Sequence, residues 1–215
     1  MLGVSQSIID SNLTLKNWAS WKEQLSFGAD PKNYNIMLDL PIIDSSPEDI
    51  NFLYFVIAHE FGHIFDFANN INSFKECNSL EHNSDPECEV EKKSWAALSW
   101  KTNITPLVSN YFENREKLCF YTCEGNILSK SNIPQIYNDL YKTNFISLYA
   151  ATQPWDDFAD SFAYFYWAKR GRSTYNLMTQ QGMTYDINAK LKSPLFKGKY
   201  RYLEKFSKST NIVYP

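Results

Sequence analysis

The feature that most constrains this chain is the apolar run FVIAHEFGHIFDF at residues 55–67, which contains two of its three histidines. His59 and His63 are four residues apart with Glu60 between them, which fits the pattern H-E-x-x-H. On a helix this spacing aims both imidazoles at one point and leaves the glutamate beside them. Two buried imidazoles and a carboxylate are costly unless they are paired or bind a metal. The run therefore predicts a metal-binding helix, and the alternative is a pair of satisfied core histidines.

The sequence around this run also predicts where the helix begins and ends. Ser46 offers a capping hydroxyl, Pro47 suits the first helical position, and two acids at 48–49 suit the first turn. We place the helix from about Pro47 to about Asn70.

Zinc is the metal that this pattern favours, because zinc lowers the pKa of a water towards neutrality and Glu60 can then take the proton of that water. Two histidines and a water leave a tetrahedral zinc site one protein ligand short. The third histidine, His82, lies in polar sequence and is expected to be solvated. Asp66 and Asn69 occupy the positions at which the metzincin pattern requires glycine and histidine, which excludes that class.

A better candidate for the third ligand lies in a second acidic cluster, WDDFADSF at residues 155–162. On a helix Asp156 and Asp160 share a face, so one can bind the metal while the other accepts a hydrogen bond from the free nitrogen of a ligand histidine. Asp157 points elsewhere and is interpreted as a first-turn acid favoured by the helix dipole.

The remaining pattern predicts an α+β fold that is mostly helical with a small mixed sheet. We expect an amphipathic helix at 15–25, a strand from Tyr34 to Leu40, and further helices at 89–101, 104–117, 134–141, 155–169 and within 193–209. At 215 residues the chain is expected to form a single domain. Residues 1–70 would form an N-terminal lobe, and 71–215 a helical lobe with a cysteine-containing insertion over 71–145.

Composition and cysteine content indicate the environment of the protein. The formal charge of −3 argues against nucleic-acid and membrane-surface partners, and no apolar run is long enough to cross a bilayer. An even number of cysteines in polar sequence favours two disulfides and a secreted or periplasmic protein whose signal peptide has been removed. Of three possible pairings we favour the two that close short loops. These are Cys77 with Cys88, and Cys119 with Cys123. The rival, a structural zinc site, usually has C-x2-C pairs, which are absent.

HEFGH, followed by Y-A-x-T-x-x-x-D-x-F-A-D-x-F at residues 149–162, resembles the motifs of gluzincin peptidases. More narrowly it is similar to the anthrax lethal factor catalytic domain, to the secreted Pro-Pro endopeptidases and to zinc peptidases whose third motif reads E-D-F-A-E. The resemblance implies a zincin-like fold in which Asp156 is the third ligand and Asp160 contacts a ligand histidine. It also implies that Tyr149, seven residues before Asp156, hydrogen-bonds the oxyanion.

Two departures from these families stand out. The third ligand is aspartate where they have glutamate, so the second helix must come about one methylene closer. The span between His63 and Asp156 is longer than in the small secreted members and holds all four cysteines.

We expect a monomeric zinc-dependent endopeptidase acting on a protein or peptide, whose strand at 34–40 pairs with an extended substrate. The alternatives are a catalytically inactive zincin-fold binding module, such as an adhesin or toxin subunit, and a metal-independent structural protein.

Overall fold

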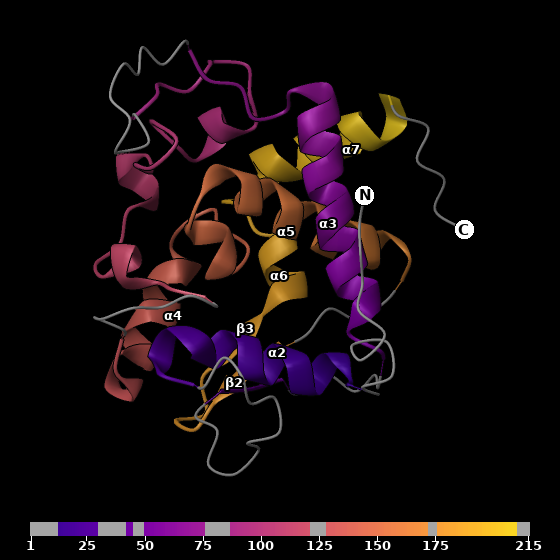
Figure 1. The fold of residues 1–215 in the computed structure, drawn as a ribbon. Coiled ribbons are helices and arrows are strands. Elements are labelled where there is room, and N and C mark those ends of the chain that lie inside the picture. Colours follow the sequence, from indigo (N-terminus) through magenta and orange to yellow (C-terminus); the bar gives the residue numbers. More distant parts are fainter. Residues whose placement is uncertain are drawn as a thin grey trace.

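The computed structural model describes residues 13–29, 42–44, 50–75, 87–120, 128–171 and 176–209, without the side chains of 42–44. Helices and a small sheet together give the α+β class that the sequence predicts (Figure 1). The α-helices are α2 (Leu15–Gln24), α3 (Leu53–Asn69), α4 (Ile133–Tyr141), α5 (Pro154–Lys169), α6 (Ile187–Leu191) and α7 (Lys197–Ser209). The strands are β1 (Ile42–Asp44), β2 (Asn176–Thr179) and β3 (Thr184–Asp186), and short 3-10 helices occupy several connections.

The centre of the fold is the contact between α3 and α5, which run in opposite directions (Figure 1). A glycine makes this contact unusually close. A Cβ atom added at Gly62 would lie 2.6 Å from the Cα of Ala159, closer than real Cβ atoms approach a backbone. The two small residues therefore let the backbones of the two helices meet. This close approach is what a short aspartate on α5 requires if it is to reach the histidines of α3.

Helix α3 ends where the sequence predicts, but it begins later. Asn70, in the left-handed conformation (φ 51°), terminates the helix. At the other end the prediction of a start near Pro47 is wrong, because α3 starts at Leu53. Asn51 forms an isolated bridge with Thr14, and its side-chain oxygen accepts the backbone N–H of Leu53. The chain just before α3 is thus held against α2, and Pro47 itself lies outside the described residues.

The sheet is antiparallel in the described part of the chain, with the strand order β1-β2-β3. Ile43 of β1 is opposite Met178, and Leu177 of β2 is opposite Tyr185 of β3. The expectation of a mixed sheet is therefore not met by these strands. The strand predicted from Tyr34 to Leu40 lies outside the described residues.

The two helices predicted at 89–101 and 104–117 are wrong. Within 87–120 the structure has only single turns of 3-10 helix, Ala96–Leu98, Val108–Asn110 and Arg115–Lys117. The backbone groups instead bond across the segment and to its neighbours. Lys75 N–H donates to the carbonyl of Glu89, and Val90 N–H donates to the carbonyl of Lys101. Long-range pairing overrides the local helical preference here.

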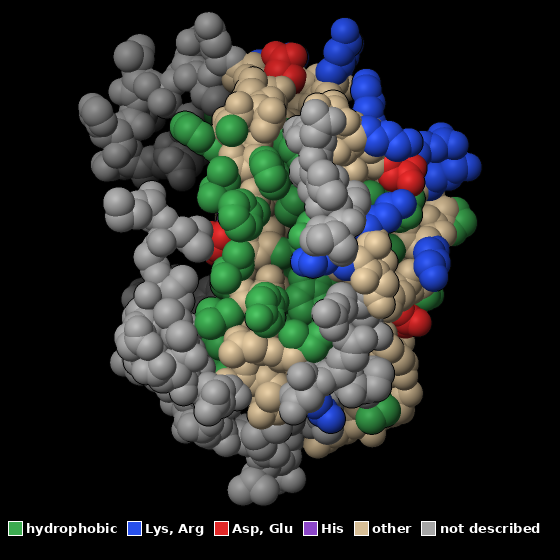
Figure 2. Space-filling view, turned by 90° about the vertical axis from the view of Figure 1, so that its right-hand side faces the viewer, with side chains coloured by type: hydrophobic (Ala, Val, Ile, Leu, Met, Phe, Trp, Pro, Cys, Tyr) green, Lys and Arg blue, Asp and Glu red, His purple; other side chains and the backbone are tan. Residues whose placement is uncertain are grey.

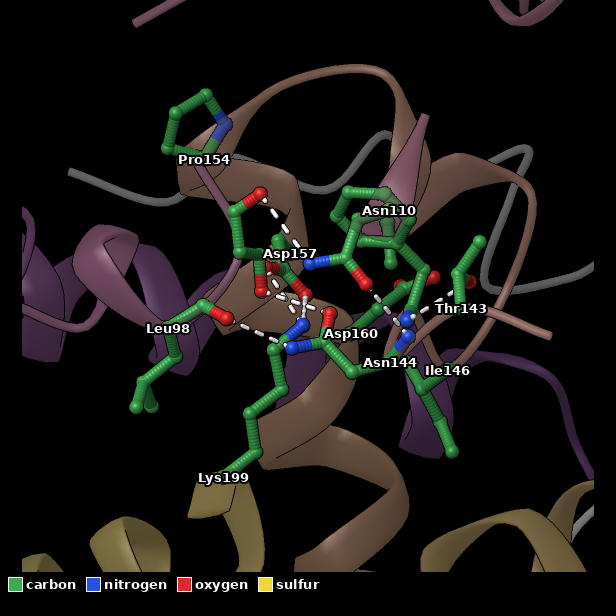
Figure 3. Close-up of polar contacts among 12 residues, drawn as sticks. Leu98, Asn110, Thr143, Asn144, Ile146, Pro154, Asp157, Asp160 and Lys199 are labelled. Atoms are coloured by element: carbon green, nitrogen blue, oxygen red, sulfur yellow. Dashed lines mark hydrogen bonds and ion pairs between the residues drawn. The ribbon is translucent and has the colours of Figure 1, made fainter. Parts of the chain in front are cut away.

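Helix α7 is attached to α5 by a buried ion pair. Lys199 Nζ lies 2.5 and 2.7 Å from the two carboxylate oxygens of Asp157, and the indole N–H of Trp100 donates to the same carboxylate at 3.1 Å. Figure 3 shows Lys199 reaching towards Asp157, with Asn144 nearby. Asp157 is fully buried and paired with Lys199 of α7. It is therefore a structural residue and not merely a first-turn acid.

The face of α3 that points away from α5 is apolar and exposed. Figure 2 shows hydrophobic side chains gathered in a band on the side of the molecule where α3 and α7 lie. The exposed large side chains of α3 are Tyr54, Phe61, Ile64 and Phe67. None of the helices in the described residues is long and apolar enough to span a membrane.

Candidate metal centre

The side chains of His59, His63 and Asp156 meet where α3 crosses α5, and this group could hold a metal ion. The two Nε2 atoms are 3.0 Å apart, and Asp156 Oδ1 lies 3.3 Å from that of His63 and 3.6 Å from that of His59. Ligand atoms around a tetrahedral zinc ion with bonds of about 2.0–2.1 Å are about 3.3–3.4 Å apart. The three observed distances bracket this value, so the ligand set fits such an ion.

The orientation of His59 is fixed from behind by Asp160. His59 Nδ1 lies 2.7 Å from Asp160 Oδ1, and both side chains are buried. Because an ionised carboxylate only accepts hydrogen bonds, His59 donates from Nδ1, and the neutral ring then has its lone pair on Nε2. That nitrogen is the one that faces His63 and Asp156. An acid four residues after Asp156 therefore stands in the position from which it can orient a ligand histidine.

Asp160 is itself held by two further side chains. The hydroxyl of Ser147 donates to Asp160 Oδ2 at 2.5 Å and also accepts the backbone N–H of Ala150. Lys22 Nζ, from α2, lies 3.8 Å from Asp160 Oδ1. Three separate parts of the chain thus converge on one buried carboxylate, and they connect it to the 3-10 helix Tyr149–Ala151.

These contacts shift the protonation of the group in the metal-free protein. Burial opposes a charge on His59, but its contact with the Asp156 carboxylate and the hydrogen bond that it donates to Asp160 outweigh burial and raise its pKa to about 9. Burial also opposes ionisation of Asp156, yet the two histidines hold its pKa well below the usual range. For Asp160, the charge of Lys22 and the contact with His59 overcome burial and lower the pKa. Both carboxylates are therefore ionised, as ligands and their partners must be.

A polar contact at the far end of α3 fixes where α5 begins. Buried Asp66 accepts hydrogen bonds from the backbone and side-chain N–H groups of Asn72, at 2.7 and 2.6 Å. The Asn72 side chain also donates to the carbonyl of Pro154 at 3.1 Å. Pro154 is the first residue of α5, and Asp156 follows it by about half a helical turn. The contact therefore helps to hold Asp156 beside His63.

Tyr149 lies next to His59, with 5.6 Å between ring centroids, and is half-buried. Its ring also lies 4.2 Å from Lys22 Nζ, measured to the centroid. Glu60 follows His59 on α3 and is half-buried. The His63 side chain is 32% exposed, so solvent reaches the group from this side. The structure thus brings Tyr149 and the H-E-x-x-H turn to one partly open site.

The other residues of the sequence prediction are less completely described. His82, Cys77 and Cys123 lie outside the described residues. Cys88 and Cys119 are described, and neither is a free thiol. Because each favoured pairing includes one undescribed cysteine, the pairings stay predictions.

Sequence reasoning missed Lys22, Ser147 and Gln153, whose amide donates to Asp156 Oδ2 at 2.5 Å. A lysine on a helix at 15–25 is ordinarily expected in solvent, yet every residue from Trp18 to Gln24 is buried. The one available signal was spacing, because Lys22 is four residues after Trp18 and so shares its face.

Comparisons of the chain with protein families, with curated proteins and with solved structures find no match.

Proposed function

We propose that the protein is a zinc-dependent endopeptidase with a zincin-like fold. The observation that carries the proposal is that Asp156 of α5 meets His59 and His63 at zinc-like spacing, beside the turn of α3 that also carries Glu60. The motifs add support, because H-E-x-x-H with a later acid pair and an upstream tyrosine is the gluzincin pattern that the chain resembles.

His59 Nε2, His63 Nε2 and Asp156 Oδ1 would hold the ion. When bound, zinc lowers the pKa of a water and polarises a peptide carbonyl. The Glu60 carboxylate accepts a proton from the attacking water and passes it to the nitrogen of the leaving amine. The hydroxyl of Tyr149 donates a hydrogen bond to the carbonyl oxygen as negative charge develops there. Asp160 keeps His59 in the tautomer that the site needs.

The test is hydrolysis of a mixed peptide library by the zinc-loaded protein, with products identified by mass spectrometry. We expect cleavage within peptides that a chelator abolishes and added zinc restores. Glu60→Gln should retain zinc and lose turnover. Normal hydrolysis by Glu60→Gln would refute this mechanism, and zinc binding without any hydrolysis would favour the inactive binding module.

The substrate would be a protein or peptide, and the cysteines favour an oxidising compartment such as the periplasm or the exterior of the cell. A non-reducing peptide map that joins Cys77 to Cys88 and Cys119 to Cys123 would support this placement. Four free thiols in the native protein would refute it.

A further inference from the structure

Lys22 is a charged side chain of α2 that reaches the rear of the metal group. It is only 1% exposed, which is rare for a lysine unless the side chain is paired. Its ammonium lies 3.8 Å from Asp160 Oδ1, the same oxygen that receives the hydrogen bond of His59. Lys22 therefore contributes directly to the position of the carboxylate that orients a metal ligand.

The same ammonium also lies against an aromatic ring of the site. Lys22 Nζ is 4.2 Å from the centroid of Tyr149 and 5.1 Å from that of Trp18. A lysine within about 6 Å of a ring centroid is attracted to the ring face, and more strongly where water is excluded. One cation thus contacts both Asp160 and Tyr149, which come from different parts of the chain.

The geometry points to Lys22 as a positioning residue that sets two groups of the site at once: Asp160, and through it His59, and the ring of Tyr149. The inference about Tyr149 rests on the proposed function, because Tyr149 matters only if a carbonyl oxygen develops charge. The inference about Asp160 and His59 concerns metal binding alone. Helix α2 is then part of the site and not only a support for α3.

The experiment compares Lys22→Met with Lys190→Met. Lys190 is a matched control because it is also 1% exposed, but its ammonium donates to the carbonyls of Leu140, Tyr141 and Thr143 at the end of α4. Zinc affinity is measured by competition with a chromophoric chelator. We expect Lys22→Met to bind zinc about 10- to 100-fold more weakly, as is typical when a residue behind a ligand is lost. Lys190→Met should lose stability and keep its zinc affinity.

A second arm measures hydrolysis of the best library peptide at saturating zinc. Lys22→Met should lower kcat about tenfold and change KM less than about twofold, because the substrate is still bound while Tyr149 is displaced. Combining Lys22→Met with Asp160→Asn should weaken zinc little more than Asp160→Asn alone. If Lys22→Met does not fold, Lys22→Gln is measured in its place with the same expectations.

Zinc affinity in Lys22→Met equal to that of the wild type would overturn the inference. Equal weakening in Lys190→Met would also overturn it, because the effect would then be general destabilisation. If the wild type binds zinc but hydrolyses no peptide, the endopeptidase proposal fails, and the zinc affinities still decide whether Lys22 positions Asp160.

Discussion

Gly62→Ala tests whether the close contact between α3 and α5 is what assembles the metal group. In the middle of a helix, alanine is ordinarily more stable than glycine by about 0.5–1 kcal/mol. Here the added Cβ would lie 2.6 Å from Ala159 Cα, where ordinary contacts begin at 3.4 Å. The helices must therefore separate by about 0.8 Å at this point (3.4 minus 2.6), because a backbone atom cannot rotate away. Overpacking of this kind costs about 1–3 kcal/mol.

The separation should also weaken metal binding. His59 and His63 belong to one helix and Asp156 to the other, so widening the contact draws the carboxylate away from both nitrogens. Since zinc–ligand distances tolerate only about 0.2 Å, a shift of about 0.8 Å should lower zinc affinity at least about tenfold. Net stability should fall by about 1–2 kcal/mol in spite of the better helix former.

Denaturant unfolding of the metal-free variants and chelator competition for zinc measure both effects. Gly198→Ala is the matched control, because a Cβ at Gly198 of α7 would meet only Leu98 at an ordinary 3.7 Å. That variant should be as stable as the wild type or slightly more so. A Gly62→Ala protein that behaves in the same way and binds zinc normally would refute the reasoning.

Three further outcomes follow from the same contacts. In metal-free protein, burial of His59 is outweighed by Asp156 and Asp160, which raise its pKa to about 9, so the folded state holds an extra proton between pH 6.5 and about 9. The free energy of unfolding should then fall by about 3 kcal/mol between pH 6.5 and 9, and zinc should remove that slope in pH-dependent denaturant titrations. Asp160→Asn should weaken zinc binding about 10- to 100-fold in chelator competition, and unchanged affinity would contradict its role. Lys199→Met should cost about 3–5 kcal/mol in denaturant unfolding because it leaves Asp157 buried without its partner, while zinc affinity stays the same.

Local patterns in the sequence were sufficient for the helices that carry the site. The H-E-x-x-H run, the glycine at the end of α5 and the apolar spacing of α4 each depend on neighbours within a few residues. These patterns predict an α+β fold in which the two histidines meet Asp156, and the structure has both features. The expected zincin-like arrangement remains part of the proposal.

Features that depend on long-range contacts could not be predicted. The first turn of α3 was placed too early because Asn51 pairs with Thr14, thirty-seven residues away (51 minus 14). The helices predicted within 87–120 fail because their backbone groups find partners elsewhere, such as the carbonyl of Ile71 for Trp95 N–H. The role of Lys22 was hidden for a similar reason, since only the folded chain brings α2 against Asp160.

X-ray absorption at the zinc edge of the protein, loaded and freed of excess metal, tests the central claim most directly. We predict one zinc ion per chain with two imidazole ligands and one carboxylate oxygen at about 2.0–2.2 Å, and no sulfur. Substoichiometric zinc, or a coordination shell without two imidazoles, would mean that His59, His63 and Asp156 meet in this fold for some purpose other than holding zinc.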